Sequence, residues 1–554
     1  MPLICIDGRE QQFENAVSVW QAIKSLWPEM NGAALGCFDG GNVLELNDIL
    51  HTDARLKLIT YADEEGRRIY ERSLRFVFLM AVSRCFPGEK IRIEHSVGGG
   101  IYLVMEGRRF YPGDVQTLKE TMRDIVEEDL PFKKERWTRK QAIKRFKEQD
   151  DIETARLLAY RPYDYFNVYL ADGLAEYFYG AMLPSTSWTN VFDLHIRTPG
   201  LILLAPDKND PSKPAPFINM PKQMATFRQS HYWCKVLECT DAADLNDLVR
   251  EGRLRDFIRV NEALQDKSIA EIADEVISRG ARVVLIAGPS SSGKTTFANR
   301  LNIHLRVNGL RPVIISMDDF YRNRADLPLE ADGQVDLEAL TALDVPLFKE
   351  CISSLLAGYE TQMPRFDFTV QRRSDQSYSM KLMPDQPLII EGIHGLNPAL
   401  HEGFDSKLLF KIYISELTCL NLDSHNRIRT TDARLLRRIV RDHQFRNTSP
   451  IETLSMWDKV RSGEEKWIFP YQENADVMFN SALHYELPIF RGLAYDLLRS
   501  IPRENEQYHK CNRIIKILNY LLPAPDSIMD EIPPLSILRE FIGGNTLYVN
   551  QESN

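Results

Sequence analysis

The sequence lacks the features that are typical of zinc-binding, secreted, membrane-spanning and nucleic-acid-coating proteins. Its eight cysteines form no C-x-x-C pair, which argues against a structural zinc site. It has no signal peptide and no long apolar run, so we expect a cytoplasmic protein with reduced thiols and no membrane partner. Its net charge of −10 argues against a protein that coats nucleic acid. With no low-complexity tract or short-period repeat, the 554 residues indicate an ordinary globular chain of several domains.

What the sequence does contain is a glycine-rich loop between a strand and a helix. Residues 288–295 match G-x-x-x-x-G-K-[ST]. The apolar run 283–287 before them predicts a buried parallel strand, and the four-residue spacing of Phe297, Leu301 and Leu305 predicts a helix after them. Strand, turn and helix in this order point backbone N–H groups at phosphate. We therefore predict a site for ATP or GTP, made by Gly288, Ser290, Ser291, Ser292, Gly293, Lys294, Thr295 and Thr296.

The residue types of this loop suggest separate roles. The two glycines permit a tightly wrapped backbone. Lys294 would neutralise the β- and γ-phosphates, and Thr295 would bind Mg²⁺. The alternative is a glycine- and serine-rich loop that carries a solvated lysine.

Two later strands also end in carboxylates. Residues 311–316 lead into Asp318 and Asp319, and residues 388–390 lead into Glu391. The carboxyl ends of parallel strands are where α/β enzymes place their chemistry. One aspartate could take a proton from an attacking hydroxyl, and Glu391 could hold Mg²⁺ directly or through water. The alternative for the two aspartates is a solvated turn.

An arginine-rich segment follows. Arg434, Arg437, Arg438 and Arg441 are spaced to share one side of a helix, and Arg446 comes after them. This pattern fits a salt-bridged surface helix. It equally fits a lid that closes on a phosphate during transfer.

Five ordered motifs within about residues 280–485 resemble the uridine kinase/phosphoribulokinase family, and within it the uridine–cytidine kinases. Residues 318–321 resemble D-S-F-Y, which implies that Asp318 rather than Asp319 is the catalytic base and that Tyr321 contacts the acceptor. Residues 336–344 resemble the acidic segment that contacts ribose, with Glu338 at the contacting position. Residues 432–442 resemble the lid. The resemblance implies phosphate contacts from Arg438, Arg441 and Arg446.

The fifth motif departs from the family pattern. Residues 364–373 resemble P-x-Y-D-F-x-x-H-x-R, the nucleoside-binding stretch, which also implies substrate contacts from Asp367 and Arg373. Phe366 stands where the family has tyrosine, and Gln371 where it has histidine. The resemblance implies transfer of the γ-phosphate of ATP or GTP to the 5′-hydroxyl of a nucleoside, with uridine or cytidine favoured. Because buried polar contacts discriminate between bases, the two departures leave the preferred base open.

The first 225 residues or so resemble the N-terminal half of threonyl-tRNA synthetases, a TGS domain followed by an editing domain. Residues 59–66, the glycine hairpin around 98–100 and residues 192–200 carry the match. The editing family's H-x-x-x-H and C-x-x-x-H pairs fall here on Arg72 and Phe76, and on Phe178 and Met182. These residue types cannot hold a metal or perform the family's hydrolysis. We expect the module to serve as a scaffold or binding surface.

We therefore predict an α/β chain: a P-loop kinase with a parallel sheet and helices on both faces, preceded by α+β domains. The expected divisions are a TGS-like domain (1–60), an editing-like domain (61–225), a helical connector (226–280), the kinase domain (281–485) and a helical extension (486–554). A basic stretch at 133–147 favours a solvated helix face over RNA contact. No role is assigned to an insertion at 417–430.

Two alternatives to a nucleoside kinase stay open. The acceptor could be another small hydroxyl compound, or the chain could be an RNA-linked switch that senses ATP or GTP. The net charge and the missing N-K-x-D string argue against the switch. We expect no nucleic-acid partner, and a homo-oligomer remains open.

Overall fold

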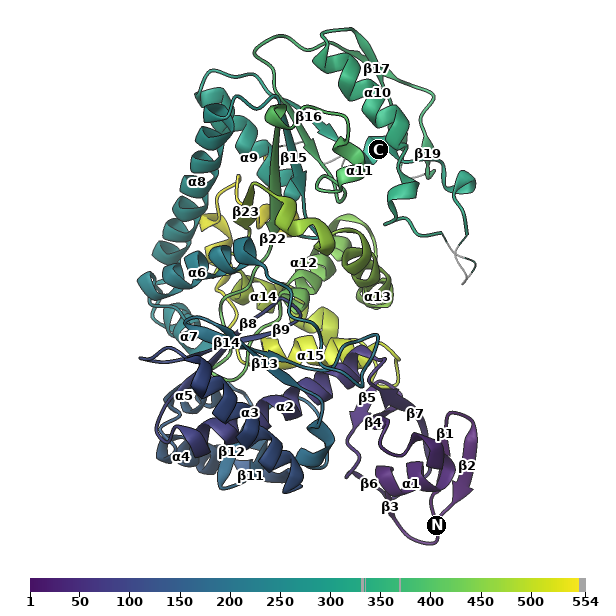
Figure 1. The fold of residues 1–554 in the computed structure, drawn as a ribbon, viewed down its shortest axis with the longest axis vertical. Coiled ribbons are helices and arrows are strands. Elements are labelled where there is room, and N and C mark those ends of the chain that lie inside the picture. Colours follow the sequence, from purple (N-terminus) through teal and green to yellow (C-terminus); the bar gives the residue numbers. More distant parts are fainter. Residues whose placement is uncertain (330–332, 334, 368–369, 548–554) are drawn as a thin grey trace.

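The computed structural model describes residues 1–329, 333, 335–367 and 370–547 (Figure 1). In this view an N-terminal unit (lower right) and a second unit (lower left) lie at the bottom of the molecule, and the unit that contains the P-loop lies above them. No helix in these described ranges is both long enough and apolar enough to cross a bilayer. The borders of the five expected domains remain predictions.

The N-terminal unit is a five-stranded sheet in the order β2-β1-β7-β4-β5, covered by one helix. Its elements are β1 (Leu3–Ile6), β2 (Arg9–Gln12), β3 (Val17–Ser18), α1 (Val19–Leu26), β4 (Ala34–Asp39), β5 (Asn42–Leu44), β6 (Ile49–Leu50) and β7 (Ala54–Thr60). Helix α1 begins after Val17 because the Ser18 side chain accepts a hydrogen bond from the Gln21 N–H and caps the helix.

The second unit places its long first helix against two antiparallel sheets, ordered β13-β14-β9-β8 and β10-β11-β12. The glycine hairpin is confirmed: β8 and β9 pair across Gly98 and Gly99, which both have positive φ. The basic stretch is only half helical, because residues 133–138 form strand β10. The elements are α2 (Glu64–Cys85), β8 (Ile91–Val97), β9 (Gly100–Met105), α3 (Pro112–Glu127), β10 (Lys133–Thr138), α4 (Arg139–Glu148), α5 (Ile152–Tyr160), β11 (Tyr165–Ala171), β12 (Leu174–Glu176), β13 (Asp193–Arg197) and β14 (Gly200–Leu204).

Arg72, Phe76, Phe178 and Met182 stand where the editing family has its metal-binding and catalytic residues. Their side chains lie together inside the second unit. The rings of Phe76 and Phe178 meet edge to face with centroids 5.8 Å apart. The Arg72 guanidinium donates to the Ala181 carbonyl and lies so close to Gly180 that a side chain there would overlap it. Met182 is also buried. Three apolar side chains and one buried guanidinium thus pack closely at these four positions.

The P-loop unit has a five-stranded, fully parallel sheet in the order β16-β21-β15-β22-β23. Alternate residues of β15 face opposite sides: Val284 and Ile286 pack in one core with α9, and Val283 and Leu285 in another with α10. The predicted doubly covered parallel sheet is thus confirmed. The elements are α6 (Pro221–Val236), α7 (Ala242–Arg250), α8 (Leu254–Ser278), β15 (Val283–Ala287), α9 (Lys294–Val307), β16 (Val313–Ser316), α10 (Val345–Leu356), β17 (Thr361–Met363), β18 (Phe366–Asp367), β19 (Arg372–Arg373), β20 (Tyr378–Met380), β21 (Leu388–Glu391), α11 (Pro398–His401), β22 (Leu409–Ser415), α12 (Thr430–Phe445), α13 (Pro450–Trp467) and β23 (Val477–Asn480).

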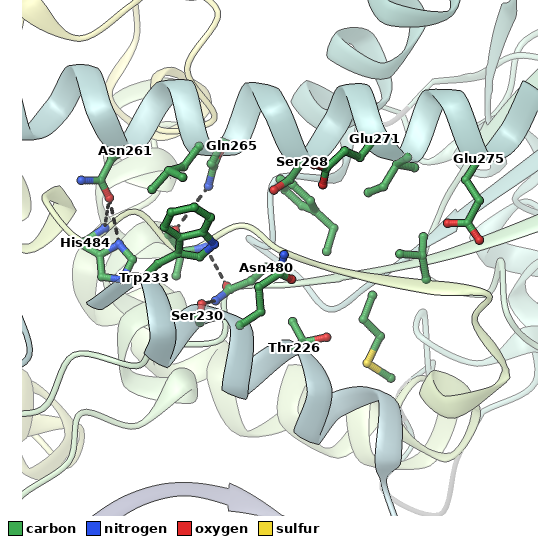
Figure 2. A pocket seen from close by; sticks show the side chains of 17 residues that line it. Thr226, Ser230, Trp233, Asn261, Gln265, Ser268, Glu271, Glu275, Asn480 and His484 are labelled. Atoms are coloured by element: carbon green, nitrogen blue, oxygen red, sulfur yellow. Dashed lines mark hydrogen bonds between the residues drawn. The ribbon is translucent and has the colours of Figure 1, made fainter. Parts of the chain in front are cut away.

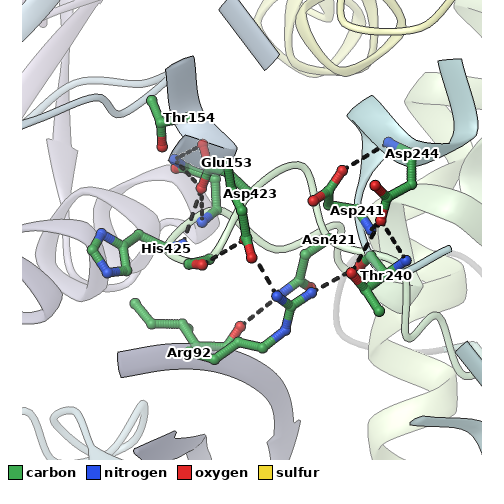
Figure 3. A network of polar contacts seen from close by, with 12 residues as sticks. Arg92, Glu153, Thr154, Thr240, Asp241, Asp244, Asn421, Asp423 and His425 are labelled. Carbon is green, nitrogen blue, oxygen red and sulfur yellow. Dashed lines mark hydrogen bonds and ion pairs between the residues drawn. The ribbon is translucent and has the colours of Figure 1, made fainter. Parts of the chain in front are cut away.

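The insertion at 417–430 docks onto the second unit. The Ile93 N–H donates to the Ser424 carbonyl (2.8 Å), and the Asn421 side chain donates to the Ile93 carbonyl (2.8 Å). Figure 3 shows the surrounding polar network, in which Arg92 bonds the Thr240 carbonyl at 2.8 Å. Glu153 accepts from the Ser424 hydroxyl at 2.5 Å. The insertion is therefore an interdomain contact that leads directly into α12.

The C-terminal extension packs against α12. It contains α14 (Glu486–Arg499), α15 (Tyr508–Leu518) and α16 (Arg539–Ile542). Short 3₁₀ turns complete the chain: η1 (Pro28–Met30), η2 (Thr186–Thr189), η3 (Met317–Phe320), η4 (Arg324–Asp326), η5 (Leu340–Ala342), η6 (Ser406–Leu408), η7 (Phe469–Asn474) and η8 (Asp526–Glu531).

Candidate functional site

The P-loop runs from the end of β15 into the first turn of α9. A side chain at Gly288 would overlap the Ile414 carbonyl of the adjacent strand, and Gly293 precedes the helix with a φ of +86°. The first intrahelical bond joins the Phe297 N–H to the Gly293 carbonyl. The backbone N–H groups of Lys294, Thr295 and Thr296 therefore precede the helical ladder, where they can bind an anion.

Lys294 extends back over the loop. Its ammonium donates to the carbonyls of Gly288 (3.0 Å) and Pro289 (3.1 Å). The same ammonium stabilises the ionised forms of Asp318 and Glu391 and lowers the pKa of both carboxyls, against the larger effect of burial. The loop thus places one cation between its own backbone and two carboxylates.

Ser290, in the middle of the loop, is held by α12 and α13. Its N–H donates to Glu464 (3.2 Å), and its carbonyl accepts from Arg434 (3.0 Å). Its hydroxyl accepts from Arg438 (2.9 Å). Arg434 and Glu464 also form a buried two-point ion pair with each other. Sequence reasoning missed Glu464, because no motif surrounds it and its two partners in the site, Arg434 and Ser290, lie 30 and 174 residues away.

Helix α12 is not a surface helix. Arg434 and Arg437 are both buried, and Arg437 pairs with Glu486 at 2.6 Å. The other three arginines gather around one buried carboxylate, Asp442, with Arg438 at 3.2 Å, Arg441 at 2.8 Å and Arg446 at 3.7 Å. Three arginines around one carboxylate leave a net positive charge on this face of α12. Arg438 brings that face into contact with the P-loop.

Two carboxylates meet at the carboxyl ends of adjacent strands. Ser316 at the end of β16 lies in register with Glu391 at the end of β21, and its hydroxyl donates to Glu391 at 3.1 Å. The Asp318 N–H donates to the same hydroxyl at 3.3 Å. Burial raises the pKa of Glu391 to about 7, and the neighbouring Asp318 charge adds to the rise. Burial also raises the pKa of Asp318.

Glu391 fits a divalent cation. A bound metal ion would favour the ionised carboxylate, which burial and the Asp318 charge both disfavour. Thr295 presents its side chain at the exposed start of α9, and hydroxyl and carboxylate oxygens are the ligands that Mg²⁺ prefers. Within the described part of the chain, no group of three His, Cys, Asp or Glu side chains could hold a metal ion. A metal here would therefore share its coordination with water or nucleotide oxygens.

Glu338 lies near the P-loop, since the charge of Lys294 favours its ionised form. It packs against Gly463, where an added Cβ would come within 2.6 Å of the Glu338 Cβ. Burial raises the pKa of Glu338 to about 7, the Glu464 charge adds to the rise, and Arg438 opposes it. The carboxylate thus faces the same arginine that contacts Ser290.

Most of the predicted nucleoside-binding residues cluster beside the two aspartates. The Tyr321 ring lies 5.8 Å from the Phe366 ring, and the Tyr321 hydroxyl donates to the Leu337 carbonyl at 3.2 Å. Asp319 accepts from the Phe366 N–H at 3.3 Å, which links the two segments. Arg373 pairs with Asp344 at 3.2 Å.

The tip of the β18–β19 hairpin lies further out. Gln371 is exposed, has a φ of +53° and accepts a 2.6 Å bond from Arg324. Asp367 accepts from the Val370 N–H at 3.3 Å. Residues 368–369 of the motif lie outside the described residues. Contacts from Gln371 and Asp367 to a nucleoside therefore remain predictions.

A separate cavity of about 210 Å³ lies between α6, α8 and β23 (Figure 2). Asn480 donates to Ser230 across it at 2.6 Å, and a 2.8 Å bond joins His484 to Asn261. None of its lining residues belongs to the P-loop or the carboxylate pair. We assign the candidate site to the P-loop and not to this cavity.

Comparisons with known proteins match different parts of the chain to different families. Residues 283–487 match the Phosphoribulokinase / Uridine kinase family. The N-terminal region is similar to Threonine–tRNA ligase of Desulforamulus reducens, with 31% identity over 182 residues. That match covers 32% of this chain and 29% of the ligase, so the chain spans under a third of the ligase's length.

Two further matches are to kinases. Uridine kinase of Deinococcus deserti is 27% identical over 197 residues, which covers 35% of this chain and 86% of that enzyme. A structure described as "a Possible Uridine Kinase from Bacillus stearothermophilus" aligns with 21% identity and a TM-score of 0.27, covering 41% of this chain and all of that one. Because of this low TM-score, we base no conclusion on this structural match.

Proposed function

We propose that the chain is a nucleoside kinase, from the premise that residues 283–487, which match the Phosphoribulokinase / Uridine kinase family, form a P-loop kinase domain. It transfers the γ-phosphate of ATP or GTP to the 5′-hydroxyl of a nucleoside, with uridine and cytidine as the first candidates. The observation that supports this most is the meeting of Lys294, Asp318 and Glu391 at the carboxyl ends of three adjacent parallel strands.

In the proposed reaction, Asp318 accepts the proton of the 5′-hydroxyl. The hydroxyl oxygen forms a bond to the γ-phosphorus, and the bond from that phosphorus to the β–γ bridging oxygen breaks. Lys294, Arg438, Arg441 and Arg446 stabilise the negative charge that spreads over the transferred group. Thr295 and Glu391 would hold Mg²⁺, which neutralises phosphate charge when bound.

Three residues near the carboxylate pair, Glu338, Phe366 and Tyr321, would select the acceptor. Glu338 would accept hydrogen bonds from the ribose hydroxyls. Phe366 and Tyr321, whose rings lie close together, would enclose the base with apolar surface. Phe366 has no hydroxyl to bond the base, so we expect discrimination between bases to rest on Gln371 and Arg373 or to be weak.

The proposal is tested by an ATP-consumption assay with uridine, cytidine, thymidine, adenosine, guanosine and inosine, with Asp318→Asn as the blank. Turnover on one or two of the six, absent in the blank, is the expected result. ATP binding without turnover on any of them would refute a nucleoside acceptor and favour another hydroxyl compound. We propose a cytoplasmic reaction without a nucleic-acid or membrane partner, and a synthetase-like region that acts as a scaffold.

A further inference from the structure

The C-terminal segment reaches back across the chain to the P-loop. Glu540 of α16 accepts two hydrogen bonds from Thr296, one from its hydroxyl (2.7 Å) and one from its backbone N–H (3.3 Å). Thr296 is the third residue of α9, so its N–H is one of the groups at the helix start that an anion can bind. A carboxylate therefore already accepts a hydrogen bond that the P-loop offers to phosphate.

A second contact fixes the segment in this place. Ile537 is fully buried against Gly293, where an added Cβ would lie 2.5 Å from the Ile537 Cγ2. Gly293 is thus constrained both by its positive φ and by a side chain from the far end of the sequence. Ile537 forms part of the wall of the P-loop.

The segment is anchored as a piece of the core. Leu538 and Phe541 are fully buried, and the Arg437 guanidinium lies 5.1 Å from the Phe541 ring centroid. The Ser536 hydroxyl donates to Glu262 of α8 at 2.6 Å. Glu540 itself is only half-buried. A rotation of this one side chain can break both bonds from Thr296 to Glu540 while the backbone of the segment stays in place.

We propose that Glu540 is a resident competitor of the nucleotide: its carboxylate occupies a phosphate position of the P-loop, and a nucleoside triphosphate must expel it to bind. This inference rests on the proposed nucleotide site. Two anions cannot share the Thr296 N–H, because like charges at hydrogen-bond distance repel strongly. Arg446 lies near enough for the Glu540 charge to favour its ionised form.

If Glu540 competes with the nucleotide, Glu540→Gln should strengthen ATP binding. The variant keeps the shape of the side chain but loses its charge, so the contact to Thr296 weakens and ATP binds about tenfold more tightly. The gain requires a phosphate on the ligand. ADP should share it, and adenosine should bind both proteins equally.

The experiment is ATP binding by calorimetry at pH 8 with EDTA. This pH keeps Glu391 ionised in both proteins, which matters because the Glu540 charge also raises the pKa of Glu391. The matched control is Glu531→Gln, which makes the same change in the same extension, where Glu531 pairs with Arg255 (2.9 Å) and Arg259 (3.3 Å). Its affinity for ATP should equal that of the unaltered protein. Thermal unfolding of each variant verifies folding.

The outcomes separate this inference from the function on which it rests. Tighter binding of ATP and ADP by Glu540→Gln alone supports it. If Glu540→Gln binds ATP no more tightly than the unaltered protein does, Glu540 does not compete with the nucleotide. The nucleotide site is still supported in that case, provided that the unaltered protein binds ATP and Lys294→Ala does not. Absence of ATP binding from both the unaltered protein and Glu540→Gln overturns both.

Discussion

Replacing Asp318 by asparagine should separate two effects that the carboxylate pair combines. The first is loss of the base: without a group to accept the hydroxyl proton, turnover should fall by about 10²- to 10⁴-fold. The second effect acts on Glu391. The Asp318 charge helps to raise the Glu391 pKa to about 7, and asparagine removes that charge. The same substitution that slows turnover should therefore strengthen Mg²⁺ binding by Glu391 at a pH below this pKa.

The size of the second effect follows from the pKa. A carboxyl with a pKa of about 7 is ionised in roughly one molecule in ten at pH 6 and in roughly nine in ten at pH 8. Only the ionised form binds Mg²⁺. Lowering this pKa can strengthen apparent Mg²⁺ binding by at most about tenfold at pH 6 and hardly at all at pH 8. Because burial remains the larger cause of the shift, we expect about a threefold effect at pH 6.

The assay is a Mg²⁺ titration of ATP binding at pH 6 and pH 8, which needs no turnover. Asp319→Asn is the matched control, since Asp319 bonds the Phe366 N–H and is not among the main charges that shift Glu391. It should lose far less turnover and keep the Mg²⁺ profile of the unaltered protein. The reasoning is refuted if Asp318→Asn retains turnover, or if its Mg²⁺ affinity at pH 6 equals or falls below that of the unaltered protein.

Three further substitutions test other parts of the site. Lys294→Ala should weaken ATP binding by tenfold or more and abolish turnover, because the loop loses its only lysine; calorimetry and the coupled assay measure both. Glu338→Gln should raise the nucleoside KM about tenfold with little change in ATP affinity, and an equal change in both would contradict its ribose role. Asp432→Asn should lower the free energy of unfolding by about 3–5 kcal/mol in urea titration, since it leaves Arg68 and Arg513 buried without their shared anion; a loss below about 1 kcal/mol would show that the network is unimportant.

The site could be predicted where its chemistry is local in sequence. The role of a glycine before a helix, or of a carboxylate directly after an apolar strand, can be predicted from the few residues around it. Lys294 and Glu391 were found in this way, and the parallel sheet that joins them is confirmed. Asp318 needed the family resemblance, because two adjacent aspartates in a turn do not reveal which one faces the site.

The rest depends on contacts between distant segments. Glu464 and Glu540 touch the P-loop from 174 and 244 residues away, and neither lies in a motif. The buried state of Arg434 was equally hidden, since a helix with four arginines on one side gives no sign of which of them have carboxylate partners elsewhere in the chain. Such residues become identifiable only when the fold brings their partners together.

These distant contacts also bear on why a kinase domain carries a synthetase-like module. Asp432, in the first turn of α12, accepts from Arg68 of the second unit (3.1 Å) and from Arg513 of the C-terminal extension (3.1 Å). Six residues along the same helix, Arg438 holds Ser290 of the P-loop. The helix that supplies the phosphate-facing arginines is thus fixed by partners on both sides of residues 283–487. Because removing either partner takes a buried cation away from Asp432, we infer that the module is retained as part of the kinase's cooperative fold.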